Sequence, residues 1–263
     1  MDMTEKLRQL AFTPMRTQRP SATKEILNQA STEAEVVDGN KVVHYVWGEG
    51  QRRVLLVHGW SGNAGHVAVL ADALVRAGCT AVIVDLPGHG ESEGKESSVI
   101  HFAKAIEAAN DRYGPIHAVV AHSLGAAATT YAMSRGLAVN KAVFFNPISS
   151  YTTLWRRSRE VMQVPPETIA EVRARAEEWL GVKFDDIEPV TAAPGFSSEL
   201  LIVHDEDDTE SPVSDSEALV NAWPRAELVK VENLGHTRVL RDEGMVRRTV
   251  DFVTGAEGVL PSP

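Results

Sequence analysis

Cysteine is almost absent from this chain: Cys79 is the only one in 263 residues. A single cysteine excludes a disulfide within the chain, which fits a reducing compartment. Basic residues are also scarce relative to acidic ones. The chain has 26 Lys and Arg but 36 Asp and Glu, which gives a formal net charge of -10. The chain lacks the basic excess typical of proteins that bind nucleic acid or anionic membranes, so we expect no nucleic-acid partner.

Long apolar runs and a leader sequence are missing as well. No apolar stretch approaches the roughly 18 residues that span a bilayer, and the first residues mix charges without an apolar region. We therefore expect a cytoplasmic protein with no integral membrane segment. The length and the 43% hydrophobic content suit one large domain, or one domain with a modest insertion.

Short apolar runs rich in Val and Ile recur along the chain between turn residues. They are continuous rather than alternating, which favours parallel strands covered on both faces. Helical patterns at 66–77, 97–112, 124–135 and 240–253 separate most of them. This alternation predicts an α/β fold, an open and mostly parallel sheet of about eight strands with helices on both faces. The expected strands are 42–47, 53–59, 80–86, 117–123, 141–147, 199–205 and 226–233, with 34–38 as an additional edge strand.

The interval between the strands at 141–147 and 199–205 is longer than a plain crossover requires. It contains helical patterns, and in the second of these Pro166 suits the first turn and Gly181 the C-terminal cap. We expect a small helical cap insertion at about 148–197; a packed decoration without a role is the alternative. The predicted organisation is an N-terminal arm with one short helix (1–32), a core domain with the cap (33–254) and a C-terminal tail (255–263).

Ser123 stands where a predicted strand meets a predicted helix, in Ala121-His122-Ser123-Leu124-Gly125. It is either an ordinary residue at this junction or a nucleophile held on a sharp turn between small residues. A serine hydroxyl needs a neighbouring base to react at neutral pH. His236 follows the last predicted strand, so it lies at the same carboxyl edge of the sheet and is the candidate base.

A catalytic histidine also needs a carboxylate that orients it. The loop after the strand at 199–205 offers Asp205, Glu206, Asp207 and Asp208, and their spacing does not choose among them. Such an acidic loop can also be merely solvated, or can hold a cation.

Two further motifs follow predicted strands: His58-Gly59-Trp60-Ser61-Gly62 after one, and Asp85-Leu86-Pro87-Gly88-His89-Gly90-Glu91-Ser92 after the next. Together with the turn at Ser123 and the two loops after the last strands, they resemble the α/β-hydrolase family over about residues 33–254. The family's acid loop reads His-Gly-x-x-Asp-x-x-Val-Pro. On His204 to Pro212 it assigns the acid to Asp208, with Asp207 in reserve, although Asp205 replaces the glycine and Ser211 the valine.

The resemblance implies an α/β-hydrolase fold and a carboxylesterase-like serine hydrolase. Ser123, Asp208 and His236 would form the catalytic triad, and the backbone N–H groups of Trp60 and Leu124 would form the oxyanion hole. No cofactor and no metal is expected, and the partner is a small-molecule substrate.

Apolar residues in the insertion suggest an apolar acyl or alkyl group in that substrate; they are Trp155, Met162, Val164 and Trp179. Hydrolysis of C–C, amide or thioester bonds, perhydrolysis, and a ligand-binding homologue without turnover remain alternatives. The sequence does not indicate the oligomeric state.

Overall fold

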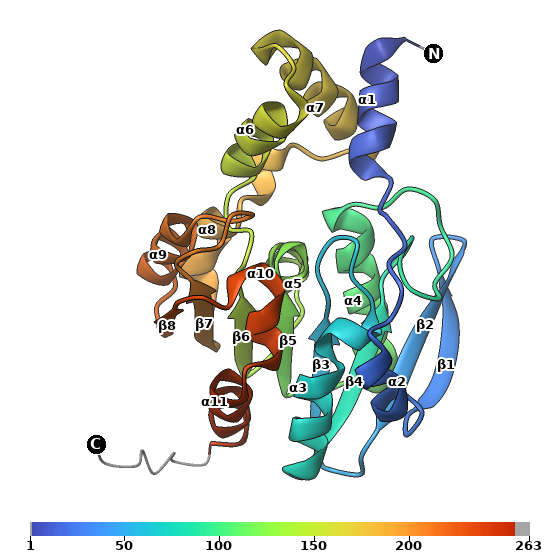
Figure 1. The fold of residues 1–263 in the computed structure, drawn as a ribbon, viewed down its shortest axis with the longest axis vertical. Coiled ribbons are helices and arrows are strands. Elements are labelled where there is room, and N and C mark those ends of the chain that lie inside the picture. Colours follow the sequence, from blue (N-terminus) through green and yellow to red (C-terminus); the bar gives the residue numbers. More distant parts are fainter. Residues whose placement is uncertain (1, 256–263) are drawn as a thin grey trace.

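The computed structural model describes residues 2–255 and contains one eight-stranded sheet (Figure 1). The strand order is β1-β2-β4-β3-β5-β6-β7-β8. Strand β2 runs antiparallel to β1 and β4, and all other neighbouring strands are parallel. This confirms the predicted α/β fold with a mostly parallel sheet of about eight strands. The strands are β1 Ser31–Val37, β2 Asn40–Trp47, β3 Arg52–Val57, β4 Cys79–Asp85, β5 Ala118–His122, β6 Lys141–Phe145, β7 Glu199–Asp205 and β8 Ala226–Val231.

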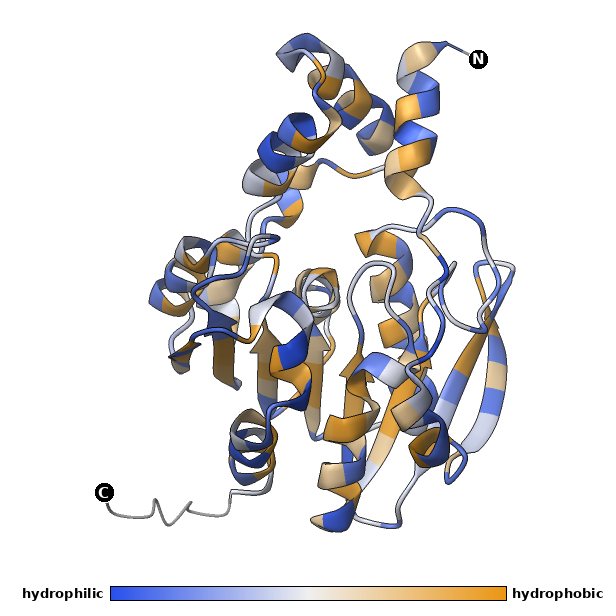
Figure 2. Ribbon diagram, viewed as in Figure 1, coloured by the Kyte–Doolittle hydropathy of each residue, from blue (hydrophilic) through white to orange (hydrophobic). Residues whose placement is uncertain are grey.

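The apolar runs form strands that are covered on both faces. Successive side chains of a strand point to opposite faces, so in β3 Leu55 and Val57 join one core layer while Val54 and Leu56 join the other. Figure 2 shows apolar residues concentrated in the central strands. Helices α4 Val99–Tyr113, α5 Leu124–Ser134 and α9 Val213–Ala222 cover the first face, and α3 Ala64–Arg76 and α11 Glu243–Thr254 cover the second.

The four helices predicted between strands are present as α3, α4, α5 and α11. Helix α9 was not predicted, and its buried residues, Ser216 and Leu219, give little apolar periodicity. The arm was predicted to hold one helix and has two, α1 Met3–Phe12 and α2 Ser21–Leu27. Of the predicted C-terminal tail, residues 256–263 lie outside the described part of the chain.

The segment between β6 and β7 is helical. Helix α6 Tyr151–Met162 and helix α7 Pro166–Leu180 lie beyond the carboxyl edge of the sheet, next to α1 (Figure 1). As the sequence predicted, Pro166 occupies the first turn of α7 and Gly181 ends the helix in the left-handed conformation, with φ 70°. Short turns then lead to β7: η1 Phe184–Ile187, α8 Pro189–Ala192 and η2 Ala193–Gly195.

The chain ends with α10 Gly235–Arg238 and η3 Val239–Arg241 ahead of α11. Within residues 2–255, no helix has both the length and the apolar character that crossing a bilayer requires.

Candidate active site

Ser123 occupies a sharp turn between β5 and α5. Its φ of 52° and ψ of -122° are unusual for a residue with a side chain, and such strain persists only where the surroundings impose it. Backbone hydrogen bonds supply that restraint: the Ser123 N–H donates to Phe145 O at 3.0 Å, and Ser123 O accepts from Ala126 and Ile148. The turn therefore holds the Ser123 side chain at the carboxyl edge of the sheet.

Glycines allow the chain to pass closely around this turn. A Cβ on Gly125 would lie 2.5 Å from His58 O, and a Cβ on Gly59 would lie 2.9 Å from the Cβ of Ser123. Position 121 on the other side of the turn holds alanine, and Ala121 is a regular residue of β5 that pairs with Phe144 of β6. The methyl group of Ala121 is thus compatible with the turn.

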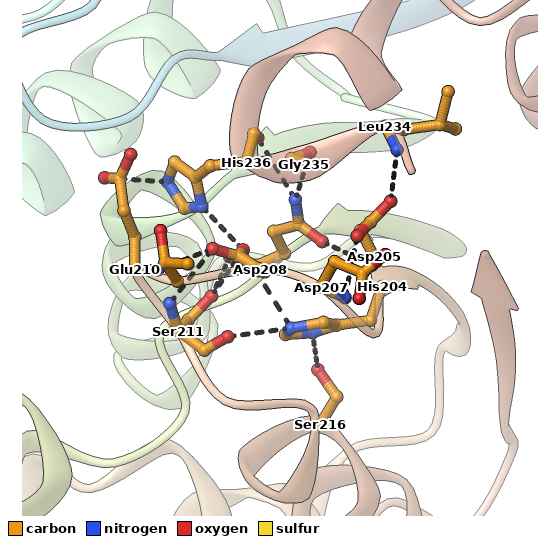
Figure 3. A network of polar contacts seen from close by, with 12 residues as sticks. His204, Asp205, Asp207, Asp208, Glu210, Ser211, Ser216, Leu234, Gly235 and His236 are labelled. Carbon is orange, nitrogen blue, oxygen red and sulfur yellow. Dashed lines mark hydrogen bonds and ion pairs between the residues drawn. The ribbon is translucent and has the colours of Figure 1, made fainter. Parts of the chain in front are cut away.

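The loops after β7 and β8 bring Asp208 and His236 together. Asp208 Oδ2 lies 2.7 Å from His236 Nδ1 (Figure 3). The carboxylate also accepts hydrogen bonds from Glu210 N at 2.7 Å and from Ser211 Oγ at 3.1 Å. Burial alone would raise the pKa of Asp208, but the hydrogen bond and charge of His236, together with the backbone N–H groups of Glu210 and Ser211, outweigh it and lower the pKa. Asp208 is therefore ionised at neutral pH.

An ionised Asp208 fixes the proton arrangement of His236. Because the carboxylate can only accept, the neutral ring carries its proton on Nδ1 and leaves Nε2 free to accept one. Nε2 lies 3.5 Å from Glu210 Oε2. Among residues 2–255, Ser123 Oγ and His236 Nε2 do not form a hydrogen bond, and a contact of this kind can close on substrate binding.

His236 nonetheless lies next to the turn at Ser123. His122 Nε2 donates to His236 O at 2.8 Å, and the centroids of the two rings are 4.6 Å apart. The structure thus joins Asp208 to His236 and holds His236 against the residue that precedes Ser123.

The other acidic side chains of the loop have structural partners. Asp205 accepts from Asp207 N at 2.8 Å and from Leu234 N at 2.7 Å, and Asp207 accepts from Asn233 N at 3.1 Å. These hydrogen bonds tie the loop after β7 (the acid loop) to the loop after β8 that carries His236 (the histidine loop) (Figure 3). Within the described residues, no group of three His, Cys, Asp or Glu is arranged to hold a metal ion.

Asn146 is a further residue of this network that the sequence analysis missed. Its side-chain amide donates to Gly235 O at 3.2 Å and to His236 O at 3.1 Å, and its oxygen accepts from Asp205 N at 2.9 Å. The expected strand at 141–147 included Asn146, whereas β6 ends at Phe145 and leaves Asn146 at the edge where the candidate residues gather.

The backbone N–H groups of Leu124 and Trp60 are the two that the sequence assigned to an oxyanion hole. Leu124 begins α5, and the first N–H groups of a helix have no partner within it. Trp60 follows β3. Within residues 2–255, neither the Leu124 N–H nor the Trp60 N–H donates to a protein atom. His89 holds the loop of Trp60, because its Nε2 accepts from Ser61 N at 3.0 Å.

Three other histidines near the site hold loops by hydrogen bonds. Burial lowers the pKa of His58, His89 and His122 to about 3, so all three are neutral at pH 7. His58 Nε2 accepts from Leu86 N, and His89 Nδ1 donates to Pro87 O. These bonds fix the loops that surround Ser123.

A cavity of about 260 Å³ opens onto these groups. Ser123, Leu124, Trp60 and Glu210 line it. The rest of its wall is largely apolar and comes from the cap, the arm and the start of α4, with Leu154, Trp155, Phe184, Ala11, Phe12 and Val99 among the lining residues.

Comparisons with known proteins give the same fold. No curated protein matches the sequence. Est1E of Butyrivibrio proteoclasticus, solved with ferulic acid bound, is 18% identical with a TM-score of 0.69, over 85% of this chain and 98% of its own. An esterase of Pyrococcus furiosus is 17% identical with a TM-score of 0.70, over 93% of this chain and 97% of its own. A putative lipase of Acinetobacter baumannii is 17% identical with a TM-score of 0.67, over 92% of this chain and 97% of its own.

At these identities the likeness shows the fold alone. The sequence itself matches a family model described as "Alpha/beta hydrolase family" over residues 54–248, which is most of the chain. That stretch includes the turn at Ser123 and the loops of Asp208 and His236. The chain therefore belongs to the alpha/beta hydrolase family.

Proposed function

We propose that this protein is a serine esterase that hydrolyses small esters with an apolar acyl group. The observation that carries the proposal is the 2.7 Å contact between Asp208 and His236 beside the strained turn of Ser123, at the wall of an apolar cavity. Family membership supports hydrolysis as the class of reaction, and the solved structures reported above include an esterase.

The reaction uses these groups in order. His236 Nε2 takes the proton of the Ser123 hydroxyl as its oxygen attacks the ester carbonyl. Asp208 keeps the Nδ1 proton in place and stabilises the imidazolium that forms. His236 then protonates the leaving alcohol, and the acyl group remains on Ser123. A water molecule, deprotonated by His236, releases the acid and restores Ser123.

The carbonyl oxygen becomes negatively charged during both attacks. The N–H groups of Leu124 and Trp60, which have no protein acceptor in the described part of the chain, are the donors that receive it. Donors fixed in the backbone need no reorganisation when the charge develops, and losing one costs on the order of 3 kcal/mol in comparable enzymes.

Substitution of the nucleophile tests the proposal. Ser123→Ala should lower kcat for a p-nitrophenyl ester by roughly 10³-fold or more, because no other group replaces the attacking oxygen. Ser134→Ala is the matched control, since Ser134 lies at the exposed end of the same helix and bonds only to Tyr131 O. Wild-type turnover in Ser123→Ala would contradict the proposal, and a wild-type protein that binds esters without hydrolysing them would favour the non-catalytic alternative.

A further inference from the structure

The N-terminal arm is fastened to the cap along the length of α1. Thr4 Oγ1 donates to Glu171 Oε2 at 3.0 Å. The Arg8 guanidinium lies 4.6 Å from the ring centroid of Trp179, and the ring of Phe12 lies 5.3 Å from that of Trp179 in an edge-on arrangement. Figure 1 shows α1 beside α7, far from α2 where the arm returns to the core. The first helix of the chain is therefore a third helix of the cap.

The same segment is also bonded to the core. Arg8 forms a 2.9 Å ion pair with Glu96, and its side chain is only 6% exposed. Phe12 O accepts from Ser97 N at 2.8 Å, and Arg16 donates to Gly90 O at 2.7 Å. Contacts on both sides restrain the last turn of α1 between the cap and the core, and this turn carries Phe12.

Phe12, the last residue of α1, reaches the cavity that Ser123 lines. It lines the same cavity as Ser123 and Trp60, and its ring centroid lies 6.3 Å from that of Trp155 on α6. Only 9% of Phe12 is exposed. A rigid aromatic ring that is buried and held on two sides cannot swing away at low cost, so it limits how far a bound group extends.

We propose that Phe12 is a specificity-determining residue, and that the N-terminal arm supplies the wall of the acyl pocket that sets the largest acyl group accepted. This inference rests on the proposed esterase function, and it names the residue that limits the size of the acyl group in the substrate. It predicts a preference for esters of short to medium apolar acids over long-chain esters.

The test compares p-nitrophenyl esters of increasing acyl length and uses the ratio of kcat/KM between a long and a short ester. This ratio cancels any difference in the amount of folded enzyme. Phe12→Ala should raise the ratio by about tenfold, because the space of the ring becomes available to added methylene groups. Phe12→Trp should lower it. Leu10→Ala is the matched control, since Leu10 is 68% exposed on the same helix and its ratio should equal that of the wild type.

A second readout does not require turnover. Methyl ketones of the same chain lengths are bound to the Ser123→Ala protein, and binding is followed by tryptophan fluorescence. The long-to-short ratio of Kd should fall in Phe12→Ala, because a long ligand that fits better has a lower Kd, while the ratio of kcat/KM rises. Unchanged ratios in both Phe12 variants, or an equal shift in Leu10→Ala, would overturn the role of Phe12 and leave the esterase intact. Absence of ester hydrolysis in the wild type would instead contradict the proposed function, and the binding ratio would still decide the role of Phe12.

Discussion

At the scale of single residues, the acid loop shows how hydrogen bonds distinguish side chains of the same chemistry. Asp205, Asp207 and Asp208 follow one another within four positions. Only Asp208 among them faces the imidazole of His236, while the other two accept from backbone N–H groups of the histidine loop. Asp208 can orient the base, and its neighbours orient the loop that carries the base.

This distinction predicts different effects for two isosteric substitutions. Asp208→Asn should lower kcat by roughly 10³- to 10⁴-fold, because an amide at this position favours the wrong tautomer of His236. Asp207→Asn should have little effect, since its amide oxygen can still accept from Asn233 N. Steady-state kinetics with one p-nitrophenyl ester measures both. A larger loss in Asp207→Asn would transfer the acid to that position.

At the scale of elements, the arm also braces the loop that carries Trp60. Thr17 Oγ1 donates to Ser61 O at 2.8 Å, and Met15 N donates to Ser61 Oγ at 3.1 Å. Asn63, the N-cap of α3, donates its side-chain amide to Thr17 O at 3.1 Å. These contacts act through the loop, so Thr17 is a positioning residue for the Trp60 N–H.

Removal of the Thr17 hydroxyl tests this bracing. Thr17→Val should lower kcat roughly tenfold with KM little changed, less than the hundredfold or more expected for loss of an oxyanion donor itself. Thr13→Val is the control, because the Thr13 hydroxyl bonds only within its own helix, to Gln9 O. A rise in KM alone, or an equal effect of Thr13→Val, would contradict the positioning role.

Some helices and strands were predictable from the sequence, and the position of others was not. The strands and the helices between them were predictable because parallel strands are continuously apolar and their helices have one apolar face. The place of α1 was not predictable, because its contacts, such as Thr4 with Glu171, join residues more than 150 positions apart. The contacts of Asn146 depend in the same way on loops that meet only in the folded chain. Spacing alone did not choose among the acidic residues either, and only the family resemblance assigned the acid to Asp208. The roles of Ser123, Asp208, His236, Trp60 and Leu124 remain predictions.

At the scale of the whole molecule, buried neutral histidines make stability depend on pH. Burial lowers the pKa of His58, His89 and His122 to about 3 and that of His44 to about 4. In the unfolded chain the same rings take up protons below about pH 6.5. Between these values the unfolded state binds more protons than the native state, so the free energy of unfolding falls as the pH falls.

The free energy of unfolding should therefore be highest above about pH 6.5 and should decrease toward pH 4, by at most about 1.4 kcal/mol per pH unit for each histidine. Urea unfolding at about pH 7.5 and about pH 5 measures the change, with the lower midpoint expected at the lower pH. A midpoint that is constant or rises toward pH 5 would show that these rings are not buried in the neutral form.

The central claim is that the Ser123 hydroxyl is an activated nucleophile, and the most direct measurement is the site of labelling by a fluorophosphonate probe. The probe phosphonylates a serine whose proton an adjacent base removes. We predict that peptide mass spectrometry of the labelled wild-type protein finds the phosphonate on Ser123, and that Ser123→Ala and His236→Ala remain unlabelled. A wild-type protein that stays unlabelled, or that carries the label on a different serine, would contradict the account.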